Sequence, residues 1–299
     1  EISECDWSSD VCSSDLLTKF NCDMTHQLAV FSPQSTVTFD SFAQSDENTF
    51  WYASDLAMML GYNDMQAILK AINRAHSVCF QLDIPITENF IQTASQNCDN
   101  DIKLTRFACY LTVMNGNISN PRVAAAQAYF AKLAEEINAT FRDADDVNRV
   151  FLRGDITDRE KTLNHLAHRH GVEEYGLFQN AGYRGLYNMN INKLKNYKGV
   201  GDLKGSLLDF MNPVELAANT FRITQTEEKI RNQNIRGQKP LERAAEEVGR
   251  SVRNVMIQTS GTLPEDLKLS DEKINKVRTG IKQTKRALEK HDKNLNKDK

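Results

Sequence analysis

The distribution of apolar residues along the chain predicts a mainly helical protein with a small β-sheet near its start. Residues 28–31 and 37–42 are short apolar-rich runs on either side of a Ser-Pro turn, and residues 50–52 are all aromatic. Such runs are typical of strands, and the first two suit a hairpin. From residue 54 onward, apolar residues recur three or four positions apart, which is the spacing of amphipathic helices. We therefore expect an α+β fold that is mainly α.

Two predicted helices lie close together after this sheet. Residues 54–60 form the first, which ends at Gly61, and residues 65–75 form the second. A turn of about three residues between two helices is the spacing of a helix-turn-helix. The polar face of the second helix carries amides and cations, which can bond base edges and phosphates. The candidate DNA-binding residues there are Gln66, Lys70, Asn73 and Arg74, although the same pattern also describes an ordinary solvated face.

A buried helix is predicted around residues 105–116. Phe107, Tyr110, Leu111 and Met114 share one face, Thr105 suits the N-cap, and a glycine follows. A further helix starts at residues 120–121 and ends near residue 141, with apolar residues facing inward at helical spacing.

The charged stretch at residues 142–146 is where we expect a domain boundary. The helical segment after it contains His165, His168 and His170, a spacing that suggests a metal site. Cys or carboxylate partners at ligand spacing are missing, and histidines near a helix C-terminus are favoured by the helix dipole. The sequence therefore favours a structural role for them.

Within residues 175–205, aromatic residues and glycines alternate over the first half, and several lysines lie in the second half. Cations beside aromatic rings can hold a single strand by neutralising phosphates and stacking on bases. The candidate residues are Tyr183, Arg184, Lys193, Lys195 and Lys198. The alternative interpretation is a compact turn with a core of aromatic residues, Tyr183 among them, and a solvated rim of lysines.

Residues 212–231 carry a clear helix start. Asn212 can cap the helix, Pro213 suits its first position, and Glu215 stands where a capping box has its acceptor. Val214, Ala217, Ala218 and Phe221 form an apolar stripe that we expect to be buried.

The C-terminal residues, from Glu272 onward, hold ten Lys/Arg against four acidic residues, a net charge of +6. Apolar side chains occupy most heptad a and d positions, but Thr284 and His291 weaken the seam. We expect a frayed basic helix that docks on its own chain, with weak self-association through this tail and attraction to phosphates or an acidic partner.

Residues 1–16 resemble a translated sequencing adapter, so we expect an artefactual leader. Without its five acidic residues the formal net charge changes from −3 to +2. The four cysteines outside it, at 22, 79, 98 and 109, lack paired spacing and are typical of reduced thiols. No apolar run approaches the ~20 residues of a membrane span, so we expect no membrane partner and a cytoplasmic protein.

Four stretches carry a family resemblance. Residues 50–62 with the helix that follows resemble the BRO-N domain of phage and viral antirepressor-type proteins, which implies DNA binding. Residues 106–117, 175–187 and 212–231 resemble the bacterial DNA damage-inducible protein D family. The resemblance implies a BRO-N-like domain at residues 17–143, a helical C-terminal domain at 144–262, and a linker with a basic helical tail at 263–299.

The sequence contains no recognisable catalytic motif: no phosphate-binding glycine loop, no nucleophile elbow and no carboxylate cluster with nuclease spacing. We therefore predict a non-enzymatic protein without cofactor or bound metal. The resemblance implies a DNA-damage (SOS) response protein that modulates the bacterial recombinase filament on single-stranded DNA. Two alternatives stay open: a sequence-specific duplex DNA binder of antirepressor type, and a nuclease with scattered acidic residues.

Overall fold

The computed structural model describes residues 30–31, 37–46, 48–95, 98–202 and 204–297. The chain divides into two compact units. The first comprises the chain up to Ile72 together with Thr87–Tyr129, and the second comprises Asn73–Ile86 together with the chain from Phe130 onward. The predicted leader, residues 1–16, lies outside the described residues.

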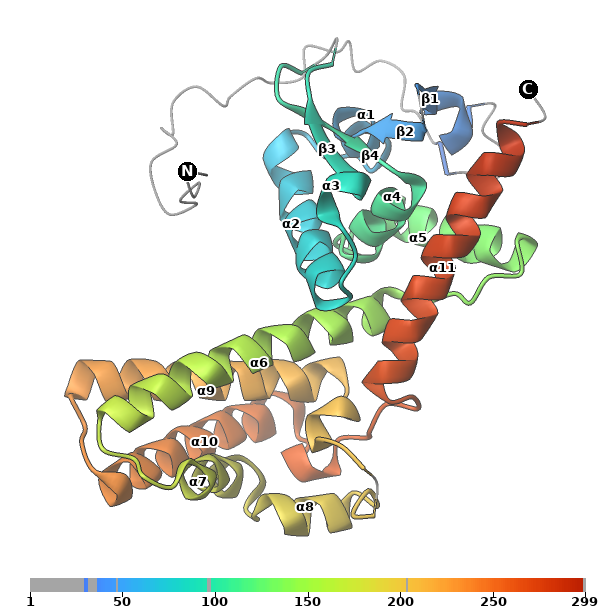
Figure 1. The fold of residues 1–299 in the computed structure, drawn as a ribbon. Coiled ribbons are helices and arrows are strands. Elements are labelled where there is room, and N and C mark those ends of the chain that lie inside the picture. The colour runs from blue at the N-terminus through green and yellow to red at the C-terminus, as the bar shows by residue number, and fades with distance from the viewer. Residues whose placement is uncertain (1–29, 32–36, 47, 96–97, 203, 298–299) are drawn as a thin grey trace. The chain divides into compact units, whose positions relative to one another are not determined.

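A small antiparallel sheet and short helices make up the first unit (Figure 1). The strand order is β1-β2-β4-β3, and Trp51 on β2 stands opposite Leu104 on β4. The predicted α+β, mainly helical fold class is confirmed. In chain order the elements are η1 (Phe39–Phe42), β1 (Gln44–Ser45), β2 (Thr49–Tyr52), α1 (Ala53–Met59), the start of α2 (Met65–Gln81), α3 (Ile86–Asn89), β3 (Phe90–Thr93), β4 (Asp101–Leu104), α4 (Arg106–Met114) and most of α5 (Pro121–Glu136).

The predicted hairpin of residues 28–31 and 37–42 is wrong in its second half. Phe39 begins the 3-10 helix η1, and its ring stacks on Trp51 at 4.5 Å between centroids. The indole N–H of Trp51 donates to the Phe39 carbonyl at 2.9 Å. The apolar residues therefore cover the sheet as a cap instead of extending it. Residues 28–29 and 32–35 lie outside the described residues.

Two buried polar residues organise the first unit. The Asp101 carboxylate on β4 accepts from the Ser54 backbone N–H at 3.1 Å and from the Ser54 hydroxyl at 2.5 Å, which ties the start of α1 to the sheet. Arg106 lies over the Trp51 ring and pairs with Asp40 at 2.7 Å. Helix α4 begins at the predicted cap, because the Thr105 hydroxyl accepts from the Ala108 N–H.

Helices alone make up the rest of the second unit. Figure 1 shows α6 running along α9, and α7 packs against α10. These elements are α6 (Ala144–Arg169), α7 (Tyr175–Tyr187), α8 (Ile191–Tyr197), η2 (Leu207–Asp209), α9 (Pro213–Gln233), α10 (Gln238–Ser260), η3 (Pro264–Asp266) and α11 (Ile274–Leu295).

Helix α9 starts as predicted but faces the opposite way. Asn212 caps it by accepting from the Glu215 N–H at 2.9 Å. Val214 and Phe221, which we expected in the core, are 60% and 54% exposed. The buried side of α9 carries Leu216 and Ile223 together with polar residues. Three of the four residues of the predicted apolar stripe are therefore on the surface, whereas Ala218 packs against the core.

The C-terminal helix α11 docks on its own chain, as predicted. It packs against α6, and Arg142 pairs with Glu272, just before the helix, at 2.5 Å. The Thr284 hydroxyl donates to the Thr140 carbonyl. Since Val277 and Ile281 are buried as well, this seam is already covered, and the structure gives no support to self-association through it.

Candidate nucleic-acid interface

The polar face of α2 is the first candidate interface. The carboxylate of Asp64 accepts from the Ala67 N–H at 2.8 Å and caps the start of the helix. Apolar residues on one side, including Ile68 and Ile72, are fully buried. This burial turns the opposite side to solvent, where all four predicted DNA-binding residues are exposed: Gln66, Lys70, Asn73 and Arg74.

The cations of this face differ in how firmly they are held. The Arg74 guanidinium lies 4.9 Å from the centroid of the Phe151 ring on α6, within range of a cation–π contact. Among the described residues, no ion pair joins Lys70 to a carboxylate, so its ammonium is free to meet a phosphate. Arg74 is thus positioned by an aromatic ring, whereas no carboxylate of the described residues holds Lys70.

Two residues of the second candidate set are buried. Tyr183 on α7 is 1% exposed, and its ring stacks against Tyr187. The side chain of Lys198, which ends α8, is 3% exposed and pairs with Glu215 at 3.1 Å. The side chains of Tyr183 and Lys198 are therefore almost wholly removed from solvent in the folded chain.

The other three residues of that set reach the surface, but two of them are engaged. Arg184 pairs with Glu246 on α10 at 3.2 Å. The Lys195 ammonium donates to the Gly205 carbonyl at 3.3 Å. Lys193 is exposed near the start of α8.

The glycines of residues 175–187 have a packing role. A Cβ atom added at Gly185 would lie 2.1 Å from the Glu246 carbonyl oxygen, and one added at Gly249 would lie 2.6 Å from the Gly182 carbonyl oxygen. Both distances are far shorter than atoms can approach. The glycines therefore let α7 and α10 cross at backbone contact, so this stretch is a helix and not the compact turn we considered.

A row of polar residues on α9 fills the space beside α7. It consists of Glu215, Asn219, Arg222 and Thr226, all at most 3% exposed. The Asn219 amide donates to the Tyr187 hydroxyl at 2.7 Å, and Arg222 lies 5.1 Å from the centroid of the Tyr183 ring. Successive spacings of four, three and four residues place this row on one side of the helix.

Glu215 is the titratable member of that row. Burial raises its pKa to about 7, and the neighbouring Lys198 ammonium offsets part of this rise. The capping-box role predicted for Glu215 is wrong, because its carboxylate bonds to Lys198. The pair is a structural link between α8 and α9.

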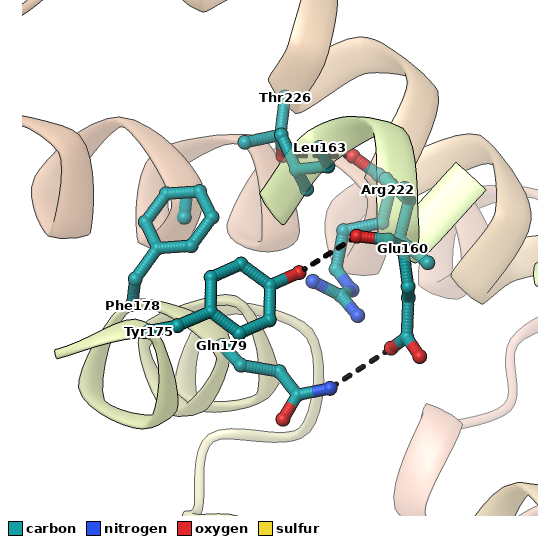
Figure 2. Close-up of a pocket in the computed structure, with 9 residues that line it drawn as sticks. Glu160, Leu163, Tyr175, Phe178, Gln179, Arg222 and Thr226 are labelled. Atoms are coloured by element: carbon teal, nitrogen blue, oxygen red, sulfur yellow. Dashed lines mark hydrogen bonds between the residues drawn. The ribbon is translucent and has the colours of Figure 1, made fainter. Parts of the chain in front are cut away.

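The cavity beside this row is too small for a ligand. Figure 2 shows the Tyr175 hydroxyl donating to the Glu160 carbonyl at 3.3 Å and the Gln179 amide donating to the Glu160 carboxylate at 2.9 Å. The cavity volume is about 10 Å³, roughly the space that one water molecule needs. Tyr183 and Arg222 therefore belong to a packed interior.

The chain is similar to known proteins over most of its length. Residues 40–131 match the BRO family, N-terminal domain, and residues 143–277 match the DinD C-terminal domain. DNA damage-inducible protein D of Escherichia coli (strain K12) is 32% identical over 254 residues, which cover 79% of this chain and 92% of that protein. The chain belongs to the DNA damage-inducible protein D family. The family membership predicted from the sequence is confirmed.

Two of the three histidines singled out in the sequence, His168 and His170, contact backbone carbonyls. A ring nitrogen of His168 lies 2.7 Å from the Val172 carbonyl, and one of His170 lies 2.8 Å from the Ile235 carbonyl. Within the described ranges, no group of three or more His, Cys, Asp or Glu side chains could hold a metal ion. In the same part of the chain, no helix has the length and apolar character needed to cross a membrane.

Sequence reasoning missed one exposed aromatic residue. Phe80 near the end of α2 is 70% exposed. It follows Asn73 by seven positions, so both residues lie on the same side of the helix. The signal was present in the sequence, because the helical pattern continues to Gln81, six residues beyond the predicted end.

Proposed function

We propose that this member of the DNA damage-inducible protein D family is a non-enzymatic DNA-damage response protein that binds DNA through the exposed face of α2. One observation carries the proposal. All four polar or cationic residues predicted on α2 are exposed, while the other candidate set has lost two residues to the interior.

The chemistry of the α2 face supports contact with DNA. Lys70 and Arg74 can neutralise phosphates, which supplies affinity on any sequence. Gln66 and Asn73 carry amides, which can bond base edges in pairs. The match of residues 40–131 to the BRO family, N-terminal domain, adds support, because resemblance to that family implies DNA binding.

The target of this binding is proposed from the family resemblance. We infer that the protein acts on single-stranded DNA coated with a bacterial recombinase and modulates that filament. The name of the Escherichia coli relative places that protein in the response to DNA damage. Arg184, Lys193 and Lys195 form the second proposed contact set, since all three reach the surface. Sequence-specific duplex binding of the antirepressor type is the alternative, and a nuclease is the second alternative.

A titration of the full chain tests these proposals. Fluorescence anisotropy would measure its affinity for a single strand, a duplex and a recombinase-coated strand, each at several salt concentrations. Incubation with magnesium would check for cleavage in parallel. For the variant carrying Lys70→Ala and Arg74→Ala, we expect weaker binding and a slope of log affinity against log salt reduced by about two, because each lost phosphate contact lowers it by about one.

Two further variants sharpen the result. Lys132→Ala with Lys161→Ala removes two exposed cations elsewhere and should leave binding unchanged. Arg184→Ala with Lys193→Ala and Lys195→Ala tests the second set. If only this triple variant loses binding, the α2 assignment is wrong. Cleavage of any strand would instead establish the nuclease alternative.

A further inference from the structure

A row of cations lies on the exposed side of α11. The helix docks on its own chain through a buried side that includes Leu288. Arg286, Lys290 and Lys293 are exposed, and their spacing of four and three positions keeps them together on the other side of the helix. Lys297, four positions further along the chain, is exposed just beyond the end of the helix. We call these four cations the basic row.

The folded chain does not neutralise the basic row. Residues 282–297 contain six Lys/Arg and two acidic residues, Glu289 and Asp292, which leaves a net charge of +4. Glu289 pairs with Lys285, a cation outside the row. Among the described residues, no ion pair involves a member of the basic row. Its positive charge is therefore available to a negatively charged ligand.

The docking of α11 fixes the direction in which the basic row points. The Thr284 hydroxyl donates to the Thr140 carbonyl, and Arg142 pairs with Glu272 just before the helix. A Cβ atom added at Gly280 would lie 2.3 Å from the Nε atom of Arg142, so the Arg142 side chain lies directly against the helix backbone. Rotation of α11 about its axis would break these contacts. The row is therefore held towards solvent, and its backbone needs no further ordering to bind a ligand.

The stability of the helix does not account for the basic row. Cations are favoured by the helix dipole only within the last turn. Lys293 is the basic residue of the last turn of α11. Arg286 and Lys290 come before that turn, so the dipole gives no reason for their charge.

The chemistry of the exposed side of α11 fits phosphates better than a protein surface. Protein interfaces are depleted of lysine and centre on apolar or aromatic side chains. The row continues backwards along the helix with the polar residues Gln283 and Thr279, which are also exposed. Leu295 is 39% exposed, but it follows Leu288 by seven positions and so lies on the docking side. The exposed side therefore offers charge without an apolar centre.

A membrane surface is a poor fit for α11. A helix that lies in a membrane interface buries its apolar side among the lipids. The apolar side of α11, which includes Val277 and Ile281, is already buried in the folded chain. A nucleic acid backbone needs no apolar contact, because its affinity comes from neutralised phosphates.

We propose that the basic row of α11 binds the phosphates of DNA independently of base sequence. From Arg286 to Lys297 the row spans about 17 Å, the length of about five phosphates on one strand. Lysine binds phosphate as a point charge and does not by itself read base edges. The choice of DNA rests on the proposed function, whereas the contact through the row does not require the α2 face.

Salt-dependent binding of the full chain tests the row. Fluorescence anisotropy would measure affinity for a single strand and for two duplexes of unrelated sequence. The row variant replaces all four cations by glutamine, which keeps a high helix propensity. We expect about tenfold weaker binding or more on all three DNAs, and a slope of log affinity against log salt lower by about three to four. The row variant carries Arg286→Gln, Lys290→Gln, Lys293→Gln and Lys297→Gln.

A charge-matched variant separates a local contact from the overall charge of the chain. It removes four exposed cations from other places, and we expect it to weaken binding by less than about threefold. Circular dichroism would verify that both variants are folded. The control variant carries Arg169→Gln, Arg236→Gln, Arg243→Gln and Lys268→Gln.

A footprint on the wild-type chain needs no substitution. Acetic anhydride acetylates exposed lysines, and mass spectrometry measures the extent at each one. Bound DNA should protect Lys290 and Lys293 at least about threefold, while Lys161, which is exposed on α6, should react as before. Equal reactivity of Lys290 and Lys293 with and without bound DNA would contradict the contact.

The remaining outcomes separate the row from the α2 face. If Lys70→Ala with Arg74→Ala leaves binding unchanged while the row variant weakens it, the α2 assignment is wrong and the row stands. The reverse result, or equal losses in the row and control variants, overturns the proposal for the row. Labelled poly-glutamate that binds the wild-type chain as tightly as DNA does would also overturn it, in favour of an acidic protein. A chain that binds no DNA would overturn both proposals.

Discussion

Helices α2 and α9 both have one buried and one exposed row, but the chemistry of the rows is reversed. On α2 the exposed residues are polar, such as Lys70, and the buried ones are apolar, such as Ile72. On α9 the exposed row includes Val214 and Phe221, while Glu215 lies inside. Periodicity thus shows that a helix has two faces but does not decide which one packs inward.

The reason for the reversal lies outside α9. A buried polar group is tolerated when its neighbours satisfy it. Lys198 pairs with Glu215, and the Tyr187 hydroxyl accepts from Asn219. The buried row of α2 has apolar residues throughout and needs no such partners. We therefore expect substitutions of the residues that pair with the buried polar row of α9 to lower the free energy of unfolding. Substitutions on its exposed apolar side should have little effect on stability.

Removal of the Lys198 side chain should have the largest effect on stability. Lys198→Ala leaves the buried Glu215 carboxyl without its cation, and at about pH 8, where that carboxyl is mostly ionised in the wild-type chain, this should cost about 3 to 5 kcal/mol. Urea denaturation would measure the loss in the free energy of unfolding. Lys193→Ala on the same helix is the control and should stay within about 0.5 kcal/mol, because its side chain is exposed. Equal effects of the two variants would contradict the buried pair.

Two neighbouring positions on α9 test the orientation of the helix directly. Ile223 is 1% exposed, so Ile223→Ala should cost about 3 kcal/mol through lost burial and the cavity left behind. Phe221→Ala, although it removes a larger side chain, should change stability by less than about 1 kcal/mol. Thermal and urea unfolding would compare the stabilities of the two variants. The opposite ranking would show that the apolar stripe of α9 faces the core.

The pH dependence of stability gives a further test of the buried polar row of α9. Burial raises the pKa of Glu215 from 4.5 to about 7, so the folded state holds its proton more tightly than the unfolded state. This contribution is present in full below the unfolded pKa and is lost as pH rises towards 7. Relative to Glu215→Gln, the wild-type chain should lose about 2 to 3 kcal/mol between about pH 5 and about pH 8. A constant difference between the two proteins would mean that Glu215 titrates normally.

The smallest effect is expected on α2. Lys70→Ala and Asn73→Ala should each change the free energy of unfolding by no more than about 0.5 kcal/mol, because both side chains are exposed. A loss above about 1 kcal/mol in either variant would show that this face packs against something in the folded chain.

Local signals in the sequence predicted local features of the fold. The caps at Thr105 and Asn212 were correct because a cap depends on residues within one turn. Strand β2 was predicted from its aromatic run, and the tail helix from its heptad spacing. The membership of the family was predicted from motifs that are themselves local.

Features that depend on distant partners could not be predicted. The reversal of α9 depends on Lys198, and the 3-10 helix at Phe39 depends on stacking with Trp51. The burial of Tyr183 depends on Arg222, which is 39 positions later in the chain. The exposure of the candidate residues on α2 was predicted correctly. The apolar residues of that helix show which of its sides is buried, so the polar residues on the opposite side must face solvent.

The glycine contact between α7 and α10 also has a consequence during protein synthesis. Gly185 and Gly249 are 64 positions apart, so α7 leaves the ribosome well before the helix that covers it. At roughly 5 to 20 residues per second, this interval lasts roughly 3 to 13 s. During that time the rings of Phe178 and Tyr187, buried in the finished protein, have no α10 to pack beneath. The apolar side of α7 therefore stays uncovered by α10 until the later helix has been synthesised.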